Sequence, residues 1–480
     1  MALFLIGSSL FSYVLRIIFA RKLSTEDYGL FFAVVSFMMF LLLFRDFGFK
    51  SALTKYIAQF NVTKEFSKIK TYIVCSLFFQ SISSLILVTF FIVMSKYLSV
   101  NYFKSDQAVP LLLIFSVYII ISMLTGIAYS ILQGFQETKW YSCSESVRMG
   151  VTLVAFFPFW FMGLGVLAPA FAFLTGISAT FIVLTVGSWK YRYLLKFKIE
   201  GIKEAVKELF RYSWPIIFRG VGDKVIGYLD VLMLTYFITL SDVGIYNAVL
   251  PTALIFMFMA RAVSNILFPM ASELWQKEDK QKLSEGLRLI YTYSIIVFMP
   301  VILSAFVFAD IFIGKLFGEQ YLPGITAFRI LVLGVLCFMI TSNNNAVLGG
   351  IGKPLKVTKV VLTAALLNVV LNLILIPRYQ MMGAAVATAG SYVLMLIMST
   401  IEVRKLVSVI SPWKIWIKGL FAGAVFGGSV YYLRGVLNFG YWLDAILAFV
   451  GGMIIYLLVV YLFGLVDIKE IRRMLRQVRK

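Results

Sequence analysis

Apolar segments about as long as a lipid bilayer is thick recur along the whole chain. A helix needs roughly 20 apolar residues to cross a membrane, and a soluble domain has no use for so many such runs. The chain is 61% hydrophobic and 14% charged, with a mean hydropathy of +0.92. Splitting it at polar and Gly/Pro positions predicts fourteen spans, near 2–20, 28–44, 69–94, 110–132, 141–160, 164–188, 213–238, 243–268, 287–309, 324–348, 355–376, 382–403, 415–433 and 440–464.

The positive charges indicate the orientation of these spans. If the N-terminus is cytoplasmic, 31 of the 44 Lys and Arg residues fall in inside-facing loops, at the inner ends of spans or in the C-terminal tail, against 7 in outside-facing loops. Cytoplasmic loops are enriched in these residues. We therefore expect a multi-pass protein of the prokaryotic cell (cytoplasmic) membrane with both termini cytoplasmic. The net charge of +21 then reflects topology rather than nucleic-acid binding.

A polar turn between two apolar helices occurs twice. The stretch "RKLSTEDYGLFFAV" (21–34) is echoed by "FITLSDVGIYNAV" (237–249), with Gly29 and Gly244 215 residues apart. Gly134 and Gly350 are 216 apart, and Pro158 and Pro377 are 219 apart. Two repeats of six helices each enter the membrane in the same direction. Such parallel repeats are typical of transporters with a substrate site between the halves.

The repeat predicts four parts. A six-helix bundle spans 1–188, an amphipathic cytoplasmic linker spans 189–212, and a second six-helix bundle spans 213–403. Two additional membrane helices and a basic cytoplasmic tail occupy 404–480. The expected fold class is therefore an all-α polytopic membrane protein with about fourteen transmembrane helices. The chain begins inside an apolar run, so we expect its first helix to be a retained or incomplete span.

Three stretches resemble the polysaccharide-transporter family, which includes the O-antigen (Wzx-like) flippases. They are "ARKLSTEDYGLFFAVVSFMMFLLLFRDFGFKSALTKYIA" (20–58), "YLDVLMLTYFITLSDVGIYNAV" (228–249) and "NLILIPRYQMMGAAVATAGSYVL" (372–394). The resemblance implies membership of the multidrug/oligosaccharidyl-lipid/polysaccharide (MOP) flippase superfamily, with two V-shaped lobes. It also implies alternating access, a cationic central cavity and a lipid-linked oligosaccharide as substrate. Glycosyltransferases or a glycan polymerase are the expected partners.

Charged residues inside predicted spans are candidates for function, because each costs about 2.5–3.5 kcal/mol at the bilayer centre. We expect Arg16, Arg219 and Arg261 to form a phosphate clamp, since an arginine fork accepts two oxygens at once. Asn265 lies one turn beyond Arg261. A plainer interpretation of Arg219 is pairing with Asp223, and Arg16 has the alternative of snorkelling outward. Glu145 and Arg148 are three residues apart and predict an intrahelical ion pair.

The candidates for ion coupling and for sugar contacts are polar residues in other spans. The chain has no histidine, so a proton or Na⁺ site rests on carboxylates, and Asp223 and Asp230 are the candidates. Their residue types fit either ion. Asn368 and Asn372 are four residues apart on one helix face. They suit sugar hydroxyls, and they equally suit bonds between neighbouring helices.

The sequence favours transport over catalysis. It contains no GxxxxGK[ST] loop for ATP, no long polar loop and no catalytic constellation, and its three cysteines show no metal-ligand or disulfide spacing. We therefore expect no enzyme, no metal and no cofactor beyond a coupling ion. The alternatives are a cation-coupled multidrug exporter of the same fold and a peptidoglycan-precursor lipid flippase.

Overall fold

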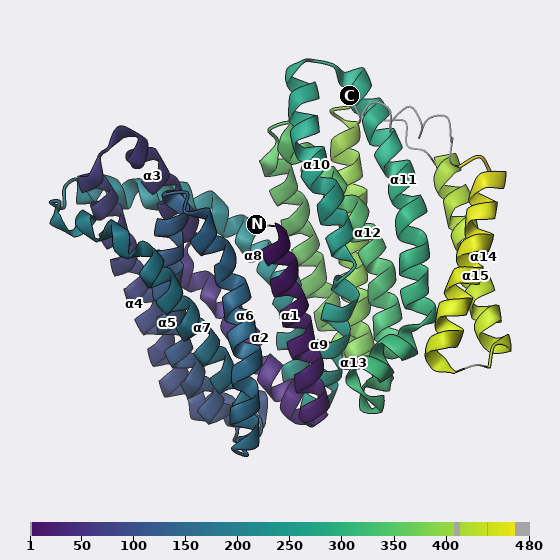
Figure 1. Cartoon of the computed structure of the whole chain (residues 1–480), viewed down its shortest axis with the longest axis horizontal. Coiled ribbons are helices and arrows are strands. Elements are labelled where there is room, and N and C mark those ends of the chain that lie inside the picture. The colour runs from purple at the N-terminus through teal and green to yellow at the C-terminus, as the bar shows by residue number, and fades with distance from the viewer. Residues whose placement is uncertain (1, 408–412, 439, 466–480) are drawn as a thin grey trace. The chain divides into compact units, whose positions relative to one another are not determined.

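The computed structural model describes residues 2–407, 413–438 and 440–465 (Figure 1). Within these residues the chain is helical and contains no strand. The side chains of residues 1–6, 8, 9, 215, 218, 219, 413–415 and 441 are outside the described set. The predicted basic tail also lies mostly outside it. Inter-residue contacts divide the chain into a first unit, residues 1–248 with 369–384, and a second unit, residues 249–368 with 385–480.

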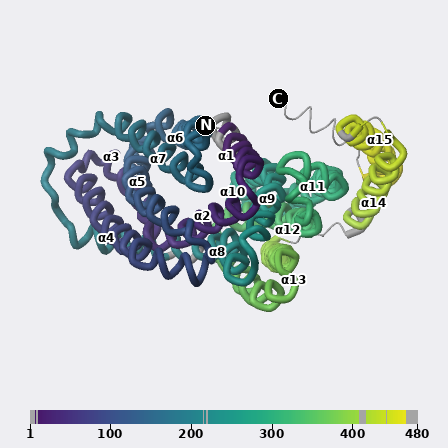
Figure 2. Tube along the Cα trace, turned by 90° about the horizontal axis from the view of Figure 1, so that it is seen from below, coloured from purple at the N-terminus to yellow at the C-terminus, as the bar shows by residue number. Residues whose placement is uncertain are grey.

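The first unit is built mainly from the N-terminal helices. Their bounds are α1 (Ala2–Lys22), α2 (Thr25–Asp46), α3 (Phe49–Thr63), α4 (Phe66–Leu98), α5 (Ala108–Gly134), α6 (Thr138–Phe161), α7 (Leu167–Ser188), α8 (Ile202–Phe237) and the first part of α9 (Leu240–Leu254). A π-helical turn follows α4 at Ser99–Phe103, and a 3-10 helix follows α7 at Trp189–Lys196. Seen end-on, α4, α5 and α7 run side by side (Figure 2).

The second unit contains the remaining helices. They are α10 (Met257–Gln276), α11 (Lys280–Val307), α12 (Ile325–Gly350), most of α13 (Pro354–Arg404), α14 (Trp413–Val436) and α15 (Tyr441–Leu462). A π-helical turn at Ile311–Lys315 and a 3-10 helix at Glu319–Gly324 join α11 to α12. Helices α14 and α15 pack as a hairpin, and α14 also packs on α11.

The fourteen predicted spans are found in these helices. Nine described helices are long and apolar enough to cross a membrane by length and composition. One of them, α13, contains two spans, since Gln380 interrupts its helical geometry with φ 50° and ψ −130°. Helices α9 and α10 together make a single span, and α1, α6, α8 and α14 complete the set. The division into bundles at residues 188, 213 and 403 stays a prediction.

Helix α3 is an element that span counting does not reveal. Its buried face, which includes Leu53, Tyr56 and Ile57, packs with Leu194 and Leu209 from the predicted linker region. The Lys70 ammonium donates to the carbonyl oxygens of Leu195 and Phe197, both at 2.7 Å. The region predicted as a linker is thus a 3-10 helix followed by the first turns of α8, and it is fixed to α3 and α4.

The two echoed turns meet each other in the first unit, which explains why glycine occupies both. A Cβ added to Gly29 would lie 1.9 Å from the Leu240 carbonyl oxygen, and one added to Gly244 would lie 2.1 Å from the Thr25 carbonyl oxygen. The hydroxyls of Thr25 and Ser241 are 2.8 Å apart. The equivalent ends of α2 and α9 therefore approach backbone to backbone.

Candidate functional site

A cavity of about 610 Å³ lies inside the first unit and is lined by residues of helices α2 to α8. Its walls mix tyrosine, serine and threonine side chains with apolar ones. Six charged groups among the described residues line it: Arg45, Asp46, Lys50, Glu145, Arg148 and Lys224. Four of them are cationic and two are acidic, so a surplus of two positive charges faces the cavity.

Arg45, at the end of α2, is the most deeply buried of the cavity cations. Its side chain is 9% exposed. One terminal nitrogen donates to the Ile119 carbonyl oxygen at 3.2 Å and to the Ser122 hydroxyl at 2.5 Å. Its Nε–H is buried and has no hydrogen-bond partner among the described residues. A buried N–H without an acceptor is costly, and a charged one more so. This guanidinium therefore has an unused donor beside the cavity.

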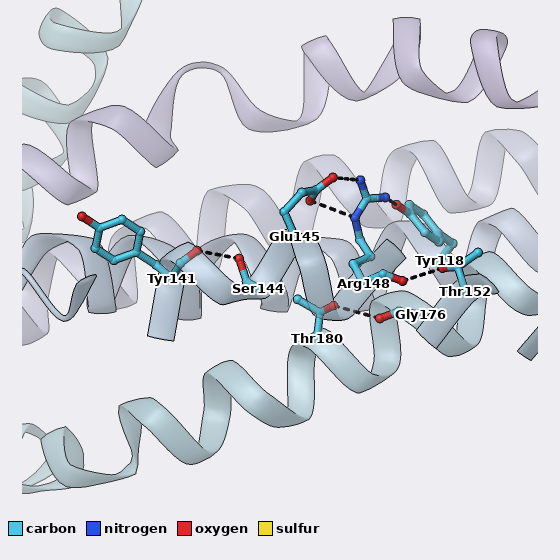
Figure 3. A network of polar contacts seen from close by, with 8 residues as sticks. All are labelled: Tyr118, Tyr141, Ser144, Glu145, Arg148, Thr152, Gly176 and Thr180. Carbon is cyan, nitrogen blue, oxygen red and sulfur yellow. Dashed lines mark hydrogen bonds and ion pairs between the residues drawn. The ribbon is translucent and has the colours of Figure 1, made fainter. Parts of the chain in front are cut away.

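Arg148, on α6, is held by Glu145 one turn earlier (Figure 3). The Arg148 Nε donates to Glu145 Oε2 at 3.0 Å, and a terminal nitrogen of Arg148 bonds to Oε1. The other terminal nitrogen donates to the Tyr118 hydroxyl at 3.4 Å. The predicted intrahelical pair is confirmed. A two-pronged contact of this kind is also how arginine holds phosphate.

The two lysines of the cavity lie against aromatic rings. The Lys50 ammonium is 3.9 Å from the centre of the Tyr129 ring, and the Lys224 ammonium is 4.7 Å from that of Tyr228. Protein atoms packed around the Lys50 ammonium lower the pKa of this lysine, and Asp46 opposes that shift. Like Asp46, an anion bound next to Lys50 would favour the charged form of this lysine.

Arg16, the first predicted clamp residue, lies in the first unit but does not line this cavity. It is half-buried, donates to the Asn247 carbonyl oxygen at 3.3 Å and lies 4.3 Å from the centre of the Phe32 ring. Arg219 is on α8, and its side chain lies outside the described residues. Its neighbour Asp223 is exposed.

Asp230 and Asn372 come together although they are 142 residues apart. Asp230 is 1% exposed and accepts hydrogen bonds from the Asn372 amide at 2.7 Å and the Tyr246 hydroxyl at 2.9 Å. One predicted coupling residue is thus bonded directly to one predicted substrate residue. Their assignment to ion coupling and sugar binding stays a prediction. Among the described residues, no group of three His, Cys, Asp or Glu is arranged to hold a metal ion.

The remaining predicted residues belong to the second unit. Asn368 is fully buried, and its amide donates to the Thr388 hydroxyl at 3.4 Å. Arg261 and Asn265 are both exposed on α10, where the Arg261 guanidinium lies 5.5 Å from the Phe258 ring centre. The structure therefore does not bring Arg261 into the same compact unit as Arg16.

The charged cavity itself was missed by the sequence analysis, although the repeat carried a signal for part of it. Arg45 precedes Arg261 by 216 residues, the same offset that relates Gly134 to Gly350. The arginine selected in the second repeat thus has an equivalent in the first. Lys50 and Lys224 had no comparable signal, because neither takes part in the repeated positions that the sequence analysis compares.

Comparison with solved structures identifies the class of fold. The chain resembles the lipid II flippase MurJ in its inward closed conformation, with a TM-score of 0.79, 17% identity, and coverage of 96% of this chain and 99% of that one. It also resembles an inward-facing multidrug resistance MATE family transporter of the MOP superfamily, with a TM-score of 0.69, 17% identity, and coverage of 84% and 94%. The protein is therefore a multi-pass helical membrane protein with the fold of the MOP superfamily.

Comparison of sequences identifies the family. Residues 1–275 match the model of the family described as polysaccharide biosynthesis protein, and the chain belongs to that family. It is 28% identical to the uncharacterized membrane protein MJ1068 of Methanocaldococcus jannaschii, over 98% of this chain and 95% of that protein. It is 24% identical to the probable low-salt glycan biosynthesis flippase Agl15 of Haloferax volcanii, over 78% and 76%.

Proposed function

We propose that this protein is a flippase. It moves a polyprenyl-(pyro)phosphate-linked oligosaccharide from the cytoplasmic to the outer leaflet of the cell membrane by alternating access. Support comes from the polysaccharide biosynthesis family and from relatives in Haloferax volcanii that are named as flippases. The six-helix repeats and the basic loops on one side also fit a transporter with cytoplasmic termini.

The single observation that carries this proposal is the buried Arg45 guanidinium with an unused Nε–H beside a cationic cavity. A pyrophosphate diester brings two negative charges, which equals the surplus of positive charge in the cavity. Arginine keeps its charge when water is excluded and presents a planar fork to phosphate oxygens. A volume of about 610 Å³ also lies within the range of roughly 300–1,000 Å³ typical of ligand sites.

The other predicted residues extend this proposal. Arg16, Arg219 and Arg261 are further candidates for phosphate contacts, and Asn265, Asn368 and Asn372 are candidates for contacts with sugar hydroxyls. Asp230 and Asp223 carry the coupling ion, either H⁺ or Na⁺. The bonded group of Asp230, Tyr246 and Asn372 supports Asp230 in this role, because a carboxylate buried in a membrane protein is most often functional. In this proposal the protein transports and does not catalyse, and glycosyltransferases or a polymerase supply and use the substrate.

Flipping in proteoliposomes tests the proposal. A fluorescent polyprenyl-pyrophosphate glycan would be the substrate, and the unmodified chain would be compared with Arg45→Ala. Arg192→Ala is a matched control, since Arg192 is exposed and lies 5.5 Å from the Trp189 ring centre outside the cavity. Loss of flipping in folded Arg45→Ala alone is the expected result. No flipping by the parent, together with uptake of an organic cation, would favour the multidrug-exporter alternative. A preference for a polyprenyl-pyrophosphate peptidoglycan precursor would favour the other alternative.

A further inference from the structure

The four cations of the cavity differ in how they are compensated. Of these four cations, only Arg148 forms an ion pair with a described residue, and this residue is Glu145. Arg45 bonds to neutral oxygens, and the lysines lie on tyrosine rings. The two N–H groups of Arg148 that hold Glu145 are therefore unavailable to a ligand as long as this pair persists.

We infer that Glu145 is an exchangeable counter-anion of the headgroup site. In the empty cavity it neutralises Arg148, and a phosphate group of the substrate takes its place on the same guanidinium. This inference rests on the proposed function. It assigns to Glu145 a role in specificity and release, and not in the stability of α6.

The exposure of the two partners shows which one can leave. The side chain of Glu145 is 44% exposed, whereas that of Arg148 is 17% exposed. Arg148 is additionally bonded to Tyr118 on α5, while the hydrogen bonds of Glu145 to described side chains go to Arg148 (Figure 3). Because the partners are three residues apart on one helix, rotation of the Glu145 side chain breaks the pair without moving the backbone.

The surroundings of Glu145 give the released carboxylate a second partner. Lys50 lines the same cavity as Glu145. The other charged groups of the cavity are Arg45 and Asp46 from α2 and Lys224 from α8, and the tyrosines nearby are Tyr118, Tyr129 and Tyr141. Glu145 therefore turns from one cation to another when the substrate enters, so no carboxylate is left without a cation.

The consequence is an exchange that weakens substrate binding and speeds release. When the Glu145 carboxylate returns to Arg148, it competes with the headgroup for the guanidinium. This competition raises KM and prevents the substrate from staying bound. Uniformly tighter binding lowers KM without raising kcat. A transporter without this competitor is thus expected to bind more tightly and turn over more slowly.

Glu145→Gln tests the inference, because glutamine keeps the shape and removes the charge. The KM for the fluorescent polyprenyl-pyrophosphate glycan should fall about tenfold, the size of effect expected for one charge-assisted contact of about 1.4 kcal/mol. At the same time kcat should fall. Glu137→Gln is the matched control, since Glu137 pairs with Lys190 outside the cavity, and it should leave both constants unchanged.

A double-mutant cycle shows whether Glu145 acts through Arg148. In an Arg148→Gln background, Glu145→Gln should no longer change KM, because the guanidinium for which it competes is absent. An unchanged or raised KM in folded Glu145→Gln, with a parent that binds and flips the glycan, would overturn the inference and leave the proposed function standing. A parent that neither binds nor flips the glycan would instead overturn the proposed function.

Discussion

The two repeats carry different side chains at the helix ends that lie away from the echoed turns. In the first repeat, Arg45 is buried beside a cavity whose wall also carries Glu145 and Arg148. At an offset of 216 residues, the second repeat has exposed Arg261, and it has Val361 and Ala364 where the first has the ion pair. Val361 and Ala364 are both buried. Related helices therefore carry a charged site in one repeat and apolar packing in the other.

The second repeat has a neutral polar network instead. Asn344, on α12, is fully buried and donates to the hydroxyls of Ser399 at 2.9 Å and Thr400 at 3.1 Å. The Tyr291 hydroxyl donates to its side-chain oxygen. Amides and hydroxyls satisfied in this way hold helices together. Under the proposed function, the charged cavity of the first repeat would bind the headgroup, while the neutral network of the second repeat supplies rigidity.

The largest expected effect concerns the end where the repeats are alike. Gly29→Ala and Gly244→Ala each place a Cβ about 2 Å from a backbone carbonyl oxygen, which cannot yield as a side chain can. We expect a loss of about 3 kcal/mol of stability, at the upper end of overpacking costs. Thermal unfolding in detergent measures it. Gly150→Ala is the control, because nothing lies within 4 Å of its added Cβ. Parental stability of both variants would mean that the two turns do not meet.

The next effect distinguishes the equivalent arginines. Arg45→Ala should lower the affinity for the pyrophosphate lipid about 10- to 100-fold, since hydrogen bonds to charged groups contribute about 1.5–3 kcal/mol. Arg261→Ala should have a smaller effect, because its side chain is exposed. Binding to the fluorescent lipid in detergent gives both values. Equal losses would contradict the asymmetry and favour a clamp shared by both repeats.

A smaller effect tests the neutral network. Asn344→Leu should lower the free energy of unfolding by about 1–3 kcal/mol, because it leaves buried hydroxyl groups without their partner, and it should not alter KM. Asn345→Leu is a useful comparison. The side-chain oxygen of Asn345 is buried and has no hydrogen-bond partner among the described residues, so its removal should be close to neutral. A changed KM in folded Asn344→Leu would place the network at the substrate.

The smallest effect is expected from a carboxylate outside the cavity. The hydrogen bond from Lys190 holds the pKa of Glu137 below its usual range. A lowered pKa means that the pair stabilises the fold at neutral pH and that this stabilisation is lost as the pH falls through the pKa of the folded state. Glu137→Gln should therefore lower the melting temperature slightly at pH 7, and this difference should shrink as the pH falls through the pKa of the folded state. A difference that does not change with pH would exclude the ion pair as its cause.

Local features of the sequence were sufficient for the fold and for contacts along one helix. Apolar length predicts a span because a bilayer has a fixed thickness. The pairing of Glu145 with Arg148 follows from helical periodicity alone. Apolar length did not predict α3, because this helix is short and amphipathic and does not span the membrane. The two predicted spans within α13 are helical segments separated by a kink at Gln380.

The sequence predicted the type of residue at the candidate site but not which residues form it. The sequence indicated that arginines within spans have a function, because placing a charge inside a membrane is costly. It did not indicate that Arg45, Lys50 and Arg148 line one cavity, or that Asp230 bonds to Asn372. The sequence by itself determined the spans, the repeat and the intrahelical pair. Only the tertiary structure decided which charges share a cavity, because that depends on how distant helices pack and not on spacing along any one of them.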